Sequence, residues 1–174
     1  MKYIYLIRHA EKDDAGLLTS RGLVASKKLG NALPIFSSVY SSGSNRAMLT
    51  AKLISRTEPT VDERANFYMA AADKSDAINK ISVSMQIPFL AAVNEYNDEE
   101  VMVGVNKQAS ALNTLVDDLM ATAPEDSSML VVSYDLSISP AMAQRGIPLT
   151  SIDFLSGYVI KDDGSIAPFS PEVD

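Results

Sequence analysis

Short, continuous apolar runs alternate along this chain with longer stretches in which apolar residues recur at helical spacing. The two most apolar runs, Tyr3–Ile7 and Met129–Val132, have the length and side-chain types of strands that are buried on both faces. The longest stretch of helical spacing extends from Asp98 to Ala121. This alternation predicts an α/β fold with a mixed, mostly parallel sheet.

Weaker signals complete the predicted order of elements. Thr19 is a plausible helix N-cap, and Pro34 ends the apolar pattern that follows it. Shorter strands are expected at Ser37–Ser42 and Pro59–Val61, and helices at Ser44–Ser55, in most of Glu63–Tyr96 with an interruption at Pro88, and around Ser137–Gln144. The turn sequence Asp162-Asp163-Gly164 between two apolar runs predicts a hairpin, so the last strands are expected to be antiparallel.

Composition narrows the class of protein. A chain of 174 residues with 47% hydrophobic and 21% charged residues is expected to form a single domain over residues 1–174. Its formal net charge of −7 argues against nucleic-acid binding, and without cysteine no thiolate can act as nucleophile or metal ligand. No segment resembles a secretory signal or reaches the length of a membrane span, so we expect a cytoplasmic protein with no membrane partner.

Three polar stretches that each follow a predicted strand contain the candidate chemistry. Arg8 and His9, the latter the only histidine of the chain, follow the first strand. A fixed cation beside an imidazole that is mostly neutral at pH 7 suits attack on a phosphoryl group, although such a pair can equally cap a strand end. Arg46 lies in the first turn of a predicted helix, where backbone N–H groups already favour anions, although an arginine there is more often a solvated surface residue. The third stretch is Ser133-Tyr134-Asp135.

Together these stretches resemble the histidine phosphatase superfamily, which is also called phosphoglycerate mutase-like. The family begins with a strand that ends in Arg-His-Gly, continues with Leu-Thr-x-x-Gly, and then has Ser-Ser-x-x-x-Arg-Ala-x-x-Thr-Ala. The corresponding residues here are Arg8-His9-Ala10, Leu18–Gly22 and Ser41–Ala51. The resemblance implies a three-layer α/β/α fold and a short phosphatase rather than a full mutase. The middle third, from about Asn66 to Glu100, matches nothing specific.

The resemblance also implies roles for individual residues. His9 would be the nucleophile that accepts the phosphoryl group, and Arg8 and Arg46 would hold the phosphoryl oxygens. The general acid of the family is a carboxylate, for which Glu63 is the preferred candidate here, with Asp62 and Glu11 as alternatives. This chemistry requires no metal and no cofactor, and the expected ligand is a small phosphorylated substrate or a phosphoprotein.

The chain departs from the family where the later strand should end in a second histidine followed by glycine. Tyr134 and Asp135 stand at those positions. Tyrosine can donate a neutral hydrogen bond to phosphate but supplies no positive charge, and a carboxylate repels phosphate unless it points away or pairs with Arg8 or Arg46. Two hypotheses therefore stand side by side. One is a weak, metal-independent phosphatase with a single histidine, and the other is a catalytically impaired protein that binds a phosphorylated ligand or a protein partner in the same cleft; a mutase ranks third.

Overall fold

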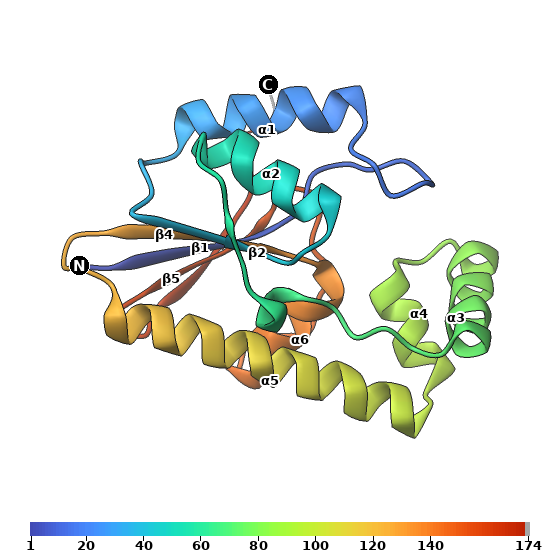
Figure 1. Ribbon diagram of the computed structural model, residues 1–174. Helices are drawn as coiled ribbons and strands as arrows, with labels where there is room; N and C mark the ends of the chain where they lie inside the picture. The colour runs from blue at the N-terminus through green and yellow to red at the C-terminus, as the bar shows by residue number, and fades with distance from the viewer. Residues whose placement is uncertain (173–174) are drawn as a thin grey trace.

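The computed structural model describes residues 1–172 as a six-stranded sheet with helices on both of its faces (Figure 1). The elements in chain order are β1 (Tyr3–Arg8), α1 (Ser20–Ala32), β2 (Ser38–Ser41), α2 (Asn45–Ser55), β3 (Thr60–Val61), the 3₁₀ turn η1 (Glu63–Ala65), α3 (Ala72–Met85), α4 (Phe89–Tyr96), α5 (Glu99–Thr122), β4 (Ser128–Ser133), α6 (Asp135–Gln144), β5 (Gly157–Lys161) and β6 (Ile166–Phe169). The predicted α/β class and three-layer arrangement are confirmed, with α1 and α2 on one face and α5 and α6 on the other.

The sheet has the strand order β3-β2-β4-β1-β5-β6. The first four strands in this order are mutually parallel, whereas β5 pairs with β1 and β6 with β5 in antiparallel fashion. This confirms the prediction of a mostly parallel sheet with an antiparallel edge. Because the carboxyl ends of parallel strands meet at one edge, the polar residues that follow β1, β2, β3 and β4 are gathered there.

Alternate residues of the central strands face the two helical layers. In β1, Ile4 and Leu6 belong to an apolar cluster with residues of α5 and α6, and Ile7 belongs to a second cluster with residues of α1 and α2. Burial on both faces explains why β1 and β4 are continuous apolar runs in the sequence. Two packed cores hold these strands rigidly, so the residues at their ends are held in fixed positions.

Helices α3 and α4 stand apart from the sheet, beside its carboxyl edge and next to the N-terminal part of α5 (Figure 1). They have an apolar cluster of their own, in which Ile78 and Val93 contact Val101 and Val105 of α5. The segment between β3 and α5 is therefore largely helical, as predicted, with Pro88 at the N-cap of α4. Within residues 1–172, no helix combines the length and the apolar character that crossing a bilayer requires.

The start of α6 differs from the prediction. The helix begins at Asp135, two residues before Ser137, because Tyr134 has extended backbone angles and its carbonyl already accepts hydrogen bonds from the N–H groups of Ser137 (3.0 Å) and Ile138 (2.8 Å). Tyr134 is consequently the N-cap residue, and Asp135 lies in the first turn of the helix rather than at the end of the strand.

Candidate active site

The strand register brings four chain segments together at the carboxyl edge. Arg8, the last residue of β1, pairs with Ser133 of β4, and Ser41 of β2 pairs with both Val132 and Val61. The residues that come next in the chain are His9, Tyr134, Ser42 and Asp62. Since β5 runs antiparallel to β1 and starts at the same edge, the segment just before Gly157 also reaches this place.

His9 is held in one orientation. Its Nδ1 lies 2.8 Å from the carbonyl oxygen of Ala10, which can only accept, so Nδ1 carries the proton and Nε2 keeps its lone pair. The side chain is only 3% exposed. Burial lowers the pKa of His9 to about 4, the hydrogen bond to Ala10 opposes this effect, and the charges of Arg46, Arg8 and Lys12 reinforce it. The imidazole is therefore neutral at pH 7, and Nε2 is its nucleophilic atom.

Arg46 approaches this nitrogen directly. Its Nε donates to His9 Nε2 over 3.4 Å, and its guanidinium lies 4.9 Å from the centroid of the Tyr134 ring. The surrounding motif explains how the arginine is placed. The Ser44 side chain caps α2 by accepting from the N–H of Ala47, and Thr50 Oγ1 donates to the Arg46 carbonyl while accepting from the N–H of Ala10. The motif thus ties the start of α2 to the residue that follows His9.

Arg8, the last residue of β1, is held by the segment before β5. Its Nη1 donates to the carbonyl of Ile152 over 2.5 Å, and its guanidinium carbon is 4.2 Å from the centroid of the Phe154 ring. Its Nε is buried and has no hydrogen-bond partner among the described residues. Burial lowers the pKa of Arg8, whereas the charges of Asp135 and Asp153 raise it. Arg8 is therefore a half-buried cation whose buried Nε has no partner among the described residues.

Tyr134 directly follows β4 at the carboxyl edge of the sheet. It is 5% exposed, and its ring lies edge-on to His9 with a centroid distance of 5.5 Å. The hydroxyl is 2.5 Å from Ser42 Oγ, which in turn lies 3.3 Å from Ser44 Oγ. Tyr134 therefore contributes to the wall of the site, and its one polar group bonds to the serine segment that precedes α2.

Asp135 is turned toward the segment before β5. Its carboxylate accepts hydrogen bonds from Ser139 Oγ (2.7 Å), from the Ile152 N–H (3.0 Å) and from the Ser151 hydroxyl, and the side chain is 8% exposed. The carboxylate forms no direct ion pair with Arg8 or Arg46 among the described contacts. The sequence left open whether this carboxylate points away or pairs with an arginine, and hydrogen bonding to α6 and to residues 151–152 is the observed arrangement.

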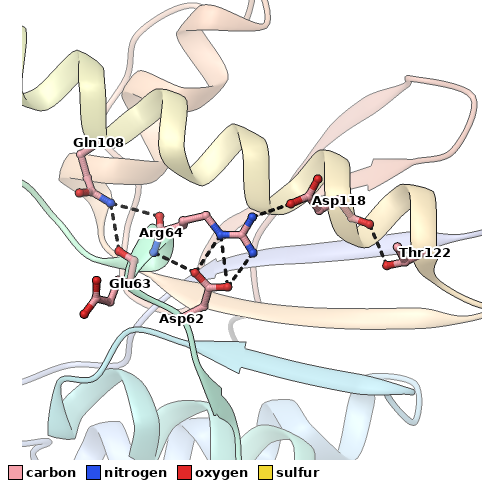
Figure 2. A network of polar contacts seen from close by, with 6 residues as sticks. All are labelled: Asp62, Glu63, Arg64, Gln108, Asp118 and Thr122. Atoms are coloured by element: carbon pink, nitrogen blue, oxygen red, sulfur yellow. Dashed lines mark hydrogen bonds and ion pairs between the residues drawn. The ribbon is translucent and has the colours of Figure 1, made fainter.

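The three candidate carboxylates for the general acid differ in their contacts. Arg64 holds Asp62 through its Nε and Nη2, keeping the pKa of that carboxyl below its usual value, and also bonds Asp118 (Figure 2). Glu11 accepts from the Thr19 hydroxyl over 2.8 Å and lies 3.5 Å from Arg21. Glu63 is exposed, and in Figure 2 its carboxylate lies outside the network while its carbonyl accepts from Gln108. Of the three, Glu63 has the carboxylate that forms no hydrogen bond or ion pair within residues 1–172.

Two aromatic residues complete the site without having been identified from the sequence. Phe154 lies 5.7 Å from the His9 ring between centroids, and Phe67 lies 4.7 Å from the Tyr134 ring. Phe154 comes three residues before the antiparallel strand β5, in an irregular segment whose sequence carried no signal for it. Phe67 lies in an irregular segment after η1 that likewise offers no signal.

Among known proteins, solved structures match this chain, whereas family models and curated sequences do not. No protein-family model matches the chain, and a search of curated proteins finds no significant relative. Solved structures do match. A phosphoglycerate mutase of Bacillus anthracis has a TM-score of 0.68 and 17% identity, over 97% of this chain and 92% of its own. YhfR of Bacillus stearothermophilus has a TM-score of 0.68 and 21% identity, over 97% and 95%.

A third match is a mycobacterial glucosyl-3-phosphoglycerate phosphatase, with a TM-score of 0.67 and 15% identity over 97% of this chain and 98% of its own. All three likenesses extend over nearly the whole of both chains. At identities this low they establish the fold, which is that of the phosphoglycerate mutase-like histidine phosphatases.

Proposed function

We propose that this chain, which has the fold of the phosphoglycerate mutase-like histidine phosphatases, is a metal-independent phosphatase that forms a phosphohistidine at His9. The observation that supports this most directly is the fixed tautomer of His9, because the bond from Nδ1 to Ala10 leaves the Nε2 lone pair directed at the Arg46 guanidinium. A neutral nucleophile beside two arginines is the arrangement that in-line attack on a phosphoryl group requires.

The proposed reaction has two steps. In the first, His9 Nε2 attacks phosphorus, the bond to the ester oxygen breaks, and the leaving oxygen takes a proton from the Glu63 carboxyl group. In the second, Glu63 removes a proton from water, the resulting hydroxide attacks phosphorus, and the N–P bond breaks to release phosphate and neutral His9. Arg46 and the unpaired Nε of Arg8 would bond the phosphoryl oxygens and stabilise the charge that develops on them.

Turnover of an aryl phosphate in the presence of a chelator tests this proposal. We expect slow hydrolysis of p-nitrophenyl phosphate by the wild type, a phosphorylated protein that can be trapped, and the loss of both in His9→Ala. Lys107→Ala is a suitable control, since Lys107 is exposed on α5, outside the site. Activity that persists in His9→Ala would refute the proposal.

The contacts of Tyr134 favour a second candidate, a protein that binds a phosphorylated ligand without turning it over. The tyrosine hydroxyl bonds to Ser42 and supplies no positive charge, so the described residues give the site two cations, Arg8 and Arg46, where the family has two arginines and a second histidine. This candidate predicts phosphate-dependent ligand binding without a trapped phosphohistidine. The double variant Tyr134→His with Asp135→Gly restores the family residues. If the substitutions limit catalysis, the rate of the double variant should rise above that of the wild type.

A further inference from the structure

Asp135, which the proposed mechanism does not use, contributes a negative charge close to the site. Asp135 is 8% exposed, and hydrogen bonds from Ser139, Ser151 and the Ile152 N–H hold its carboxylate. All three groups donate, as an ionised carboxylate requires, because such a carboxylate can only accept. The buried group therefore brings a full negative charge close to the site.

This charge is coupled to Arg8 in two ways. Through the backbone, Asp135 holds the N–H of Ile152, and the carbonyl of the same residue accepts from Arg8 Nη1. Through space, the negative charge of Asp135 opposes the effect of burial on the pKa of Arg8. Asp135 thus compensates part of the positive charge that Arg8 would otherwise offer to a ligand.

Among the described residues, few other charged groups affect the pKa of Arg8 or of His9. Asp153 and Arg46 also act on Arg8, and Lys12 acts on His9; Lys12 and Asp153 are exposed and of opposite sign. From β5, Tyr158 faces Asp135, and both burial and the charge of Asp135 raise its pKa, so it stays neutral. Inside the site, Arg8 and Arg46 contribute two positive charges, Asp135 contributes one negative charge, and the neutral His9 contributes none at pH 7; Glu63, the proposed acid, adds no charge while it holds the proton that it donates. The net charge is +1.

We propose that Asp135 makes this site selective for phosphoryl groups that carry a single negative charge, such as those of phosphodiesters or singly protonated phosphomonoesters. The inference rests on the proposed function, because it assumes that the ligand phosphoryl group lies between His9, Arg8 and Arg46. A singly charged group is balanced by the net charge of the site. A doubly charged group would lose water around both charges while one of them stayed uncompensated in a buried place.

The expected size of the effect follows from Coulomb's law. A unit charge about 10 Å away, at an effective dielectric constant of about 20, changes the affinity for one additional charge by roughly tenfold. Asp135→Asn should remove this discrimination with little change of shape. The hydroxyl groups of Ser139 and Ser151 can turn from donating to accepting, and the amide oxygen can still accept from the Ile152 N–H.

Methyl phosphate and methyl sulfate form a matched pair of probes for a binding titration between pH 5 and pH 8. Methyl sulfate carries one charge throughout, whereas methyl phosphate gains its second charge near pH 6. In the wild type we expect the affinity for methyl phosphate to fall about tenfold relative to methyl sulfate as the pH rises. His9 is neutral over this range and adds no titration of its own.

Two variants distinguish the effect of the Asp135 charge from the effect of its hydrogen bonds. In Asp135→Asn the two affinities should stay parallel across the range, while Ser139→Ala, which removes one hydrogen bond but no charge, should keep the wild-type difference. Tighter binding of methyl phosphate at pH 8 than at pH 5 would overturn the inference and leave the proposed function standing. Binding of neither ester would refute both. If the Asp135 variant does not fold, the pH dependence of the wild type decides alone.

Discussion

The hydroxyl group of Tyr134 lies 2.5 Å from Ser42 Oγ and so joins the start of α6 to the segment that precedes α2. Both residues stand at the carboxyl edge of the sheet, each directly after one of the neighbouring strands β4 and β2. The bond keeps the tyrosine ring edge-on to His9 and under the Arg46 guanidinium. Tyr134 supplies no positive charge, but its ring packs against both His9 and Arg46 and so helps to position them.

Substitution of the two partners separates the structural role of Tyr134 from a role as donor to the substrate. Tyr134→Phe should lower kcat by about a hundredfold if the hydroxyl donates to the phosphoryl oxygen in the transition state. Ser42→Ala leaves that hydroxyl in place and should lower kcat much less. Steady-state kinetics with p-nitrophenyl phosphate provide the measurement. Equal losses in the two variants would show that the pair acts only by positioning the ring.

Much of this edge was predictable because apolar runs and strand ends are local features of the sequence. His9 and Tyr134 directly follow strands that are buried on both faces, so their placement at one edge follows from the strand pattern and a parallel sheet. Arg46 was predictable from the Ser41–Ala51 stretch that resembles the family motif, whereas its position at a helix start was not enough alone. These inferences need no knowledge of contacts between distant segments.

The contacts of residues 151–154 could not be predicted in this way. Ile152 and Phe154 lie in an irregular segment without apolar periodicity, and they reach Arg8 across more than 140 positions of sequence. The orientation of Asp135 depends on the same segment, through Ser151 and Ile152. Likewise, only the ion pair with Arg64 distinguishes Asp62 from its neighbour Glu63, and the sequence alone left both as candidates.

Glu63 and Asp62 are predicted to respond differently to removal of their charge. Glu63→Gln should lower kcat by a factor of 10² to 10⁴ for an alkyl phosphate, whose leaving oxygen needs a proton, and far less for p-nitrophenyl phosphate. Asp62→Asn removes the negative charge that pairs with Arg64, while the amide oxygen can still cap η1, so it should lower stability by up to about 1 kcal/mol without dependence on the leaving group. A plot of rate against leaving-group pKa distinguishes the two effects. The same slope for Glu63→Gln and the wild type would exclude Glu63 as the acid.

The burial of His9 predicts a specific loss of stability in acid. The pKa of His9 is about 4 in the fold and 6.5 in the unfolded chain, so the unfolded state binds the proton more readily. The contribution of His9 is therefore complete above pH 6.5, falls as the pH drops toward 4, and reaches a loss of about 3 kcal/mol below that value.

Urea unfolding of the wild type and of His9→Asn between pH 7 and pH 4 measures this contribution. Asparagine keeps a side-chain N–H for the Ala10 carbonyl but does not titrate. The free energy of unfolding of the wild type should fall by about 3 kcal/mol more than that of the variant. Parallel curves for the two proteins would contradict the prediction.

The glycine of the Leu-Thr-x-x-Gly stretch provides a last prediction, about the loop that leads away from His9. A Cβ on Gly22 would lie 2.4 Å from the carbonyl oxygen of Glu11, a contact that backbone atoms on both sides cannot easily relieve. The same turn of α1 is capped by Thr19, whose hydroxyl oxygen accepts from the Gly22 N–H over 3.0 Å. Gly22→Ala should therefore destabilise the fold by about 1 to 3 kcal/mol, as overpacking does elsewhere, although alanine favours helices.

Gly43→Ala is the matched control, since a Cβ there meets only Val61 Cγ1 at 3.5 Å, an ordinary contact. Urea midpoints of the two variants measure the difference, and a Gly22→Ala protein as stable as the wild type would show that the loop after His9 can shift away from α1.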